Sequence, residues 1–190
     1  MIYLLGLRHS MQTEWDSPEP HLAAKFERLK AFLSETVRST AVEAIAEETN
    51  QEFENCSGKK SLSRLVAEAS SPPLRYVPCE PNSAERKALG IPTAQEIVDR
   101  CRTSGCVDDR LEQCRDSELL KYFPAREKCW LERIRQVSVG PILLVCGPDH
   151  IRTFSCRLIE SQIPFKVVSF DWCASDESKY GALPLAERPI

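Results

Sequence analysis

The sequence predicts an α/β protein with a mainly parallel sheet of about five strands and helices on both faces. Short apolar runs alternate with stretches that carry a helical apolar stripe, a pattern typical of strand-helix-strand units. Two apolar runs end alike, in Gly6-Leu7-Arg8-His9 and Gly147-Pro148-Asp149-His150. Because residues just past the carboxyl ends of parallel strands line the ligand crevice of open α/β folds, both histidines are expected in one cleft.

The first half of the chain supplies three of the strands. Ile2–Leu7 is a short apolar run and predicts the first strand, and the stripe of Leu22, Phe26, Leu29, Phe32, Leu33 and Val37 predicts a helix over His21–Arg38. Ala41–Ala46 predicts the second strand, which ends at the acidic pair Glu47-Glu48. Ser61–Ala69 predicts a helix capped by Ser61, and Leu74–Cys79 predicts the third strand.

The second half continues the alternation. Pro81–Arg86 is typical of a helix entry with Gly90 as its stop, and Thr93–Cys101 predicts a further short helix. The charged stretch 103–120 has no clear stripe and is expected to be a linker with some helix. Pro124 opens an amphipathic helix to Val137, followed by a strand over Pro141–Cys146, a helix over Asp149–Ser161 and a strand over Phe165–Phe170. Residues 1–172 are thus expected to form one domain, with 173–190 as a polar tail.

Composition narrows the class of protein. A chain of 190 residues with a net charge of −3 and scattered basic residues gives no electrostatic reason to expect nucleic acid or an anionic membrane as the main partner. The first residues lack a basic region and run directly into the His9 motif, and no later run approaches the roughly 18 apolar residues of a membrane span. A cytoplasmic protein acting on a small-molecule or peptide substrate is expected.

The cysteines predict little chemistry. Their number is odd, at nine, so reduced thiols are expected rather than a disulfide framework. Cys101, Cys106 and Cys114 lie close in sequence, but their spacing is not the paired Cys-x-x-Cys of a structural zinc site. Cys79 and Cys146, near predicted strand ends, are the only candidates for a reactive thiol, which would need an activating partner.

Chemistry-bearing residues follow each predicted strand. In chain order these are His9, Glu47 and Glu48, Glu80, His150, and Asp171 with Trp172, and Arg126 adds a cation at the start of the amphipathic helix. Imidazoles and carboxylates suit a divalent metal such as manganese, cobalt or zinc, with His9, Glu47, Glu48 and His150 as candidate ligands. The same groups also suit metal-free work, with a histidine as general base and Arg126 stabilising an oxyanion. The sequence does not decide between the metal-assisted and the metal-free chemistry.

Each of these residues also has a purely structural interpretation. His9 could cap the first helix, Arg126 could pair with Glu127, and Trp130 could belong to the core. Glu80 and Arg86 could form a local capping pair or close one wall of the cleft. Glu47 and Glu48 point to opposite faces of an extended chain, so at most one of them is expected in the site.

The order of these motifs resembles the TraB/Tiki and erythromycin-esterase-like superfamily. The resemblance rests on Gly6-Leu7-Arg8-His9, the acidic strand end at Glu47-Glu48, the Arg-x-x-x-Trp spacing of Arg126 and Trp130, and Gly147-Pro148-Asp149-His150. It implies a compact α/β domain whose paired histidines and a glutamate form the active centre. It further implies metal-dependent peptide hydrolysis as in the Tiki branch, metal-free ester hydrolysis, or haem binding as in the ChaN-like branch.

The sequence as a whole therefore favours a hydrolase of ester or peptide bonds. His9, His150 and a glutamate, either Glu48 or Glu47, are expected to position a water, with or without a metal, while Arg126 stabilises developing charge. The alternative is a module of the same fold that binds haem, a metal or a small ligand without turning it over. A third alternative is a domain that serves only as an interaction surface.

Overall fold

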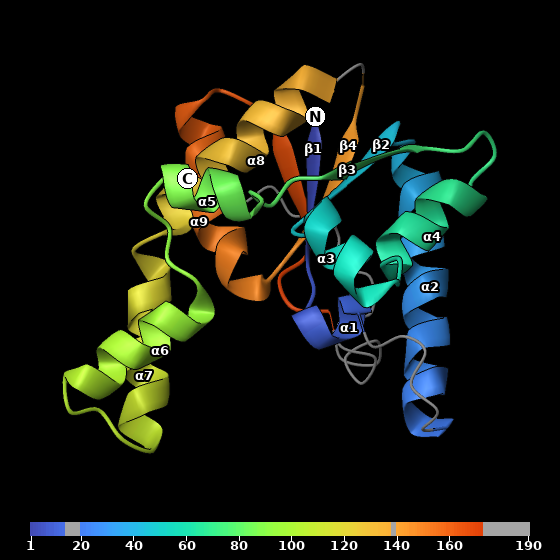
Figure 1. Ribbon diagram of the computed structural model, residues 1–190. Coiled ribbons are helices and arrows are strands. Elements are labelled where there is room, and N and C mark those ends of the chain that lie inside the picture. Colours follow the sequence, from blue (N-terminus) through green and yellow to red (C-terminus); the bar gives the residue numbers. More distant parts are fainter. Residues whose placement is uncertain (14–19, 138–139, 173–190) are drawn as a thin grey trace.

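A five-stranded, wholly parallel sheet forms the centre of the protein in the computed structural model, which describes residues 1–13, 20–137 and 140–172 (Figure 1). The strands are β1 (Ile2–Gly6), β2 (Ala44–Glu47), β3 (Arg75–Pro78), β4 (Ile142–Cys146) and β5 (Phe165–Ser169). They lie in the order β3-β2-β4-β1-β5. The predicted fold class is confirmed, and every strand lies within or at the margin of its predicted range.

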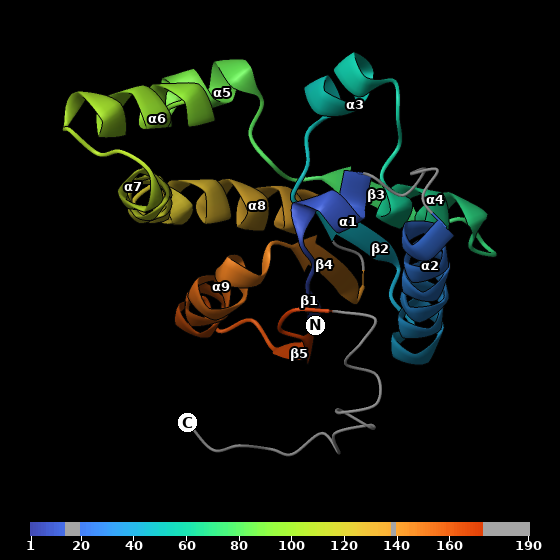
Figure 2. The same ribbon diagram turned by 90° about the horizontal axis from the view of Figure 1, so that it is seen from below.

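Helices cover both faces of this sheet, and each face has its own apolar core (Figure 2). On one face α8 (Phe123–Val137) and α9 (Pro148–Glu160) pack on the strands, with Trp130, Ile134 and Phe154 fully buried. On the other face lie α1 (His9–Thr13), α2 (Pro20–Thr40) and α4 (Leu62–Ala69), which bury Leu29, Leu33 and Val66. Successive side chains of a strand point to opposite faces of the sheet, which explains this division. Leu4 packs in one core and the next residue, Leu5, packs in the other.

The local capping signals hold in detail. The Ser61 side chain accepts a hydrogen bond from the Arg64 backbone N–H and begins α4 as predicted. Asn82 and Glu85 form a capping box at α5 (Ser83–Ala88), and Gly90, with φ of 66°, follows the end of that helix. Two short helices were not expected, α1 and α3 (Gln51–Ser57).

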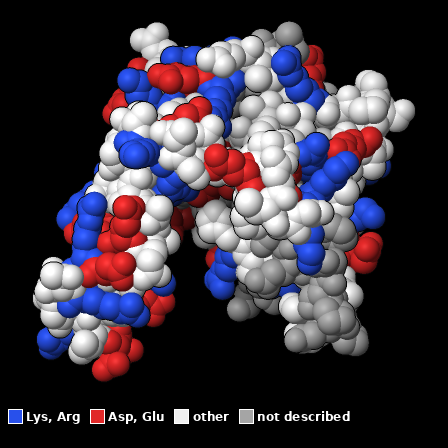
Figure 3. All heavy atoms as spheres, in the orientation of Figure 1, with Lys and Arg blue, Asp and Glu red and all other residues white. Residues whose placement is uncertain are grey.

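The stretch 103–120, expected as a linker with some helix, is mostly helical. It contains the end of α6 (Ala94–Thr103) and a complete helix, α7 (Asp109–Leu120), and the two helices form an arm that extends away from the sheet (Figures 1 and 2). No residue of α7 is buried, so this helix has none of the apolar stripe by which a sequence reveals a helix. Figure 3 shows the arm standing apart from the body, with acidic and basic side chains interspersed over this face.

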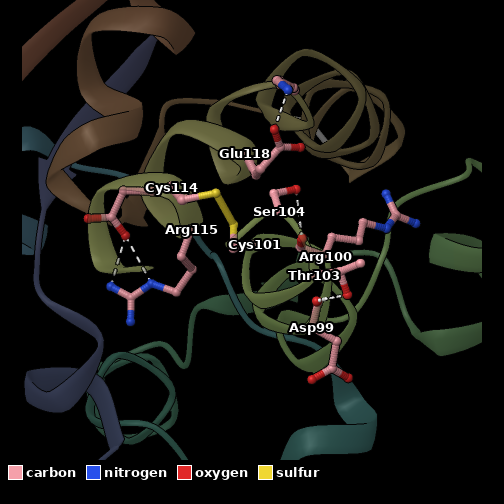
Figure 4. Close-up of a disulfide and its surroundings, with 10 residues drawn as sticks. Asp99, Arg100, Cys101, Thr103, Ser104, Cys114, Arg115 and Glu118 are labelled. Atoms are coloured by element: carbon pink, nitrogen blue, oxygen red, sulfur yellow. Dashed lines mark hydrogen bonds and ion pairs between the residues drawn. A yellow bond between two sulfur atoms is a disulfide. The ribbon is translucent and has the colours of Figure 1, made fainter. Parts of the chain in front are cut away.

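The expectation of reduced thiols is wrong at one place. Cys101 on α6 and Cys114 on α7 form a disulfide across the arm, with their Cα atoms 5.9 Å apart (Figure 4). Cys106, Cys79 and Cys146 are free thiols. The pairing depends on how α6 and α7 pack together, which the spacing of the cysteines does not reveal.

The predicted tail at 173–190 lies outside the described residues. Within the described part of the chain, none of the helices has the length and apolar character that crossing a membrane requires.

Candidate active site

Three neighbouring strands bring the predicted histidines and glutamate together. β4 lies between β2 and β1, and the register pairs Gly6 with Cys146 and Glu47 with Val145, so the carboxyl ends of these strands are level. His9 begins α1 directly after β1, and His150 lies in the first turn of α9 directly after β4. Both therefore point from equivalent positions toward Glu48, which follows β2.

Glu48 is the buried centre of the site, with only 1% of its side chain exposed. Its Oε1 lies 3.5 Å from His9 Nε2 and 3.4 Å from His150 Nε2 and also accepts a hydrogen bond from Arg126, while Oε2 accepts one from the Gly147 backbone N–H at 2.6 Å. Burial acts to raise the pKa of Glu48, but His150, Arg126 and His9 outweigh it and hold that pKa well below its ordinary value. Glu48 is thus a carboxylate across the neutral range.

Glu47 does not join this group. Its side chain points to the opposite face, where its Oε2 accepts hydrogen bonds from Ser61 and, at 2.6 Å, from Tyr76. Burial raises the pKa of Glu47, an effect that these hydrogen bonds only partly offset. The alternation of an extended chain thus separates the two adjacent carboxyl groups, and Glu47 is not positioned as a ligand beside the histidines.

Arg126 joins two carboxylates. Its guanidinium donates to Glu48 and makes three contacts of 2.9 to 3.1 Å with the two oxygens of Glu80. Glu80 also accepts from Arg86 at 2.7 Å and from the Trp130 indole N–H at 3.0 Å. Arg126 therefore pairs with the strand ends rather than with Glu127, and Trp130 is both a core residue and a partner of the site. Glu80 and Arg86 form an ion pair that extends the network.

His9 is the accessible member, with 64% of its side chain exposed. Its Nδ1 lies 3.3 Å from Gln12 Oε1, and the Gln12 amide nitrogen donates to the Leu7 carbonyl at 3.4 Å. In this orientation of the amide, Oε1 can accept a hydrogen bond from an Nδ1–H of His9, and Nε2 faces Glu48. Sequence reasoning missed Gln12, although its position three residues after His9 on a helix places it on the same side.

His150 is the enclosed member, with 3% of its side chain exposed. Phe123 stacks on the imidazole at a centroid distance of 3.6 Å, and Trp130 packs against it at 4.5 Å. Burial acts to lower the pKa of His150, but contacts with Glu127 and Glu48 outweigh burial and raise it. Neither Phe123 nor Glu127 was expected in the site, because from sequence alone Phe123 only precedes the amphipathic helix and Glu127 is one of its residues.

The glycines of the two Gly-x-x-His motifs have different functions. A Cβ at Gly147 would lie 3.3 Å from Glu48 Oε2 and 3.7 Å from His9 Nε2, so this glycine makes room for the site. A Cβ at Gly6 would lie only 1.8 Å from the Phe170 carbonyl oxygen, so this glycine admits the chain that follows β5. Only Gly147 lies against residues of the site.

The remaining predicted residues lie beside the site or outside it. Asp171 pairs with Arg8 at 3.1 Å, and Trp172 is buried in the core that faces α2. Cys79 and Cys146 are completely buried, and burial raises the pKa of both thiols well above the ordinary value. Neither thiol has the activation that a nucleophile requires.

The site does not fit a resident metal. Across residues 1–13, 20–137 and 140–172, no group of three or more histidine, cysteine, aspartate or glutamate side chains is arranged to hold one. Arg126 bonds Glu48 through one amino group and lies 3.2 Å from His150 Nε2 through the other, so a guanidinium already bridges two of the expected ligands. A bound metal stays a prediction that these contacts do not support.

Comparisons of the chain with family models, with curated proteins and with solved structures gave no match. The resemblance to the TraB/Tiki and erythromycin-esterase-like superfamily therefore stays a prediction based on its motifs.

Proposed function

We propose that this protein is a hydrolase of ester or peptide bonds in which His9 activates water without a metal. The observation that carries the proposal is the setting of His9, an exposed imidazole whose Nδ1 contacts Gln12 Oε1 and whose Nε2 lies 3.5 Å from Glu48 Oε1. Two atoms at this separation can both contact one water at a hydrogen-bonding distance of about 2.8 Å. A general base oriented by one neighbour and supported by a carboxylate is the arrangement that such a reaction needs.

The charges around the site give its residues different roles. Glu48 is a poor base because its pKa is lowered, and it is better suited to stabilise the imidazolium that forms when His9 takes a proton. Arg126 and His150 hold Glu48 in its ionised form and in position. The guanidinium is already occupied by Glu48 and Glu80, so its first role is to fix the two carboxylates.

The reaction then follows in two steps. His9 Nε2 takes a proton from water while the water oxygen forms a bond to the substrate carbonyl carbon. The tetrahedral intermediate collapses with cleavage of the C–O or C–N bond, and the proton on His9 passes to the departing oxygen or nitrogen. The substrate approaches from the side of His9, since His150 and Glu48 are enclosed.

The test is hydrolysis of chromogenic esters and fluorogenic peptides by the full chain and by three variants. His9→Ala and Glu48→Gln are expected to lower kcat/KM by about 100-fold or more, the usual contribution of a positioned general base. His21→Ala is the matched control, because this histidine is on the exposed surface of α2, and it should retain full activity. Thermal melts establish that each variant is folded.

Two results would refute the proposal. One is full activity in a folded His9→Ala protein, and the other is the absence of hydrolysis by the native protein over a broad panel of substrates. The assay is repeated with added manganese, cobalt or zinc, and activity that requires the metal would replace the metal-free scheme. A haemin titration that changes the absorbance, in the absence of hydrolysis, would favour the ligand-binding alternative.

A further inference from the structure

A buried carboxylate that the proposed reaction does not use lies behind His150. Glu127 on α8 is 1% exposed, and its Oε1 lies 2.9 Å from His150 Nδ1. The same oxygen accepts a hydrogen bond from the Thr153 hydroxyl, and Oε2 lies 3.6 Å from Arg157 Nε. A carboxylate is costly to bury without partners, and here two hydrogen-bond partners converge on one oxygen, Oε1.

The His150 ring has two constraints of different kinds. Phe123 stacks on it at 26° and Trp130 packs against it, and these aromatic contacts fix the plane of the imidazole. They leave open which ring nitrogen faces which way, because a 180° rotation about the Cβ–Cγ bond keeps the same plane. A partner specific to one nitrogen is needed to settle this choice.

Glu127 is that partner. A carboxylate only accepts hydrogen bonds, so its contact with Nδ1 requires the proton to be on Nδ1. Nε2 is then directed toward the opposite side, where Arg126 lies at 3.2 Å and Glu48 Oε1 at 3.4 Å. The two consecutive helix residues Arg126 and Glu127 thus contact the two different nitrogens of one ring.

We propose that Glu127 is a positioning residue of this site, which acts through His150 by holding its Nδ1–H and so directing Nε2 to Glu48 and Arg126. Glu127 does not itself reach the exposed side of the site, where a substrate would meet His9. Its loss lets the ring turn or change tautomer, and Glu48 then loses one of the contacts that hold its carboxylate beside His9. The effect on turnover rests on the proposed hydrolase, whereas the state of the His150 ring does not.

The experiment therefore combines a spectroscopic and a kinetic measurement on the full chain. The chain has only three histidines, so the imidazole NMR signals are assigned with His9→Ala and His21→Ala proteins. The native protein is expected to show a downfield Nδ1–H signal of His150 that exchanges slowly with solvent. Glu127→Gln keeps the shape of the side chain but removes its charge, and it should shift that signal upfield and speed its exchange.

The kinetic readout separates positioning from binding. Glu127→Gln is expected to lower kcat at least roughly tenfold with little change in KM, because a carboxylate that holds the tautomer of a histidine acts on turnover and not on substrate binding. Glu132→Gln, an exposed residue of the same helix, is the matched control and should change neither the signal nor kcat. An unchanged His150 signal in a folded Glu127→Gln protein overturns the proposal.

The proposal stays testable if the Glu127→Gln protein does not fold or if the native protein shows no hydrolysis. If Glu127→Gln does not fold, Thr153→Val removes a second contact to the same carboxylate oxygen, and it should shift the His150 signal in the folded protein. No shift in that variant also overturns the proposal. If the native protein hydrolyses nothing, the proposed function fails, but the NMR comparison still decides whether Glu127 holds the His150 ring.

Discussion

Glu47 and Glu48 are adjacent in sequence, yet replacing each by glutamine should change the pH dependence of stability in opposite directions. Glu48 is a carboxylate held by positive partners, whereas Glu47 is a carboxyl group whose pKa is raised, mainly by burial. The free energy of unfolding of the native protein therefore contains two contributions of opposite sign. Single substitutions separate them.

The contribution of Glu48 is lost in acid. Its folded-state pKa lies below the ordinary value of 4.5, so the unfolded chain binds more protons as the pH falls. The stability that Glu48 supplies is complete above about pH 4.5 and decreases below it. Removing one partner of a buried ion pair costs about 3–5 kcal/mol, and because glutamine can still accept from Gly147, we expect a value near 3 kcal/mol at pH 7. In a domain of this size that lowers Tm by roughly 6–12 °C.

The contribution of Glu47 has the opposite sign. Its folded-state pKa lies above the ordinary value of 4.5. At a pH between 4.5 and the folded-state pKa, the folded chain therefore binds more protons than the unfolded chain. Stability then decreases as the pH rises through this interval, by up to about 1.4 kcal/mol per pH unit for a single group. Glu47→Gln removes this slope, because a glutamine amide does not titrate.

The assay is urea denaturation followed by tryptophan fluorescence at intervals from about pH 2.5 to pH 8, a range that includes the acid interval in which the Glu48 contribution is lost. The free energy of unfolding of Glu48→Gln should lie furthest below that of the native protein at neutral pH. The difference in free energy of unfolding between Glu47→Gln and the native protein should shift in favour of the variant as the pH rises. Glu132→Gln on the exposed side of α8 is the control and should follow the native curve. Parallel pH curves for all the proteins would refute the assigned environments of Glu47 and Glu48.

Three other changes test separate parts of the structure. Arg126→Ala removes the cation that two buried carboxylates share and should cost about 3 kcal/mol in denaturant titrations, since Glu80 keeps Arg86 and Glu48 keeps the Gly147 N–H. Calorimetry should detect zinc binding by this variant but not by the native protein, and a stable variant that binds no zinc contradicts the bridging role of the guanidinium. Gly147→Ala places a Cβ 3.3 Å from Glu48 Oε2 and should cost about 1 kcal/mol in stability but more in activity, and equal activity would show that the close approach is dispensable. Reducing the Cys101–Cys114 disulfide should speed hydrogen exchange in α6 and α7 and leave the sheet unchanged, whereas faster exchange throughout would show that the arm supports the whole domain.

Some of the site was predictable because local rules determine it. The apolar runs define the strands, and the carboxyl ends of parallel strands share one edge, so His9 and His150 were expected together with one of Glu47 and Glu48. Period-two alternation also separates Glu47 from Glu48 without any knowledge of the fold. Capping residues such as Ser61 and Asn82 fix helix starts through contacts within four residues. Helix starts of this kind can therefore be predicted from the sequence.

Other features depend on contacts between elements far apart in the chain. Helix α7 buries no residue and so has no apolar stripe, and its disulfide exists because α6 lies beside it. The order β3-β2-β4-β1-β5 places β2 beside β3, so Glu48 and Glu80 follow neighbouring strands, and Arg126 of α8 pairs with both of them and not with its neighbour Glu127.

The sequence by itself determined the α/β class, the strand positions and the two histidines at strand ends, because each depends on periodicity or on neighbours along the chain. Only the tertiary structure decided that His9 is exposed while His150 is enclosed, and that Glu127 contacts the imidazole of His150. The physical reason is that burial and charge pairing are properties of packed surfaces. A glutamate on an amphipathic helix has the same local pattern whether it meets water or the imidazole of another helix.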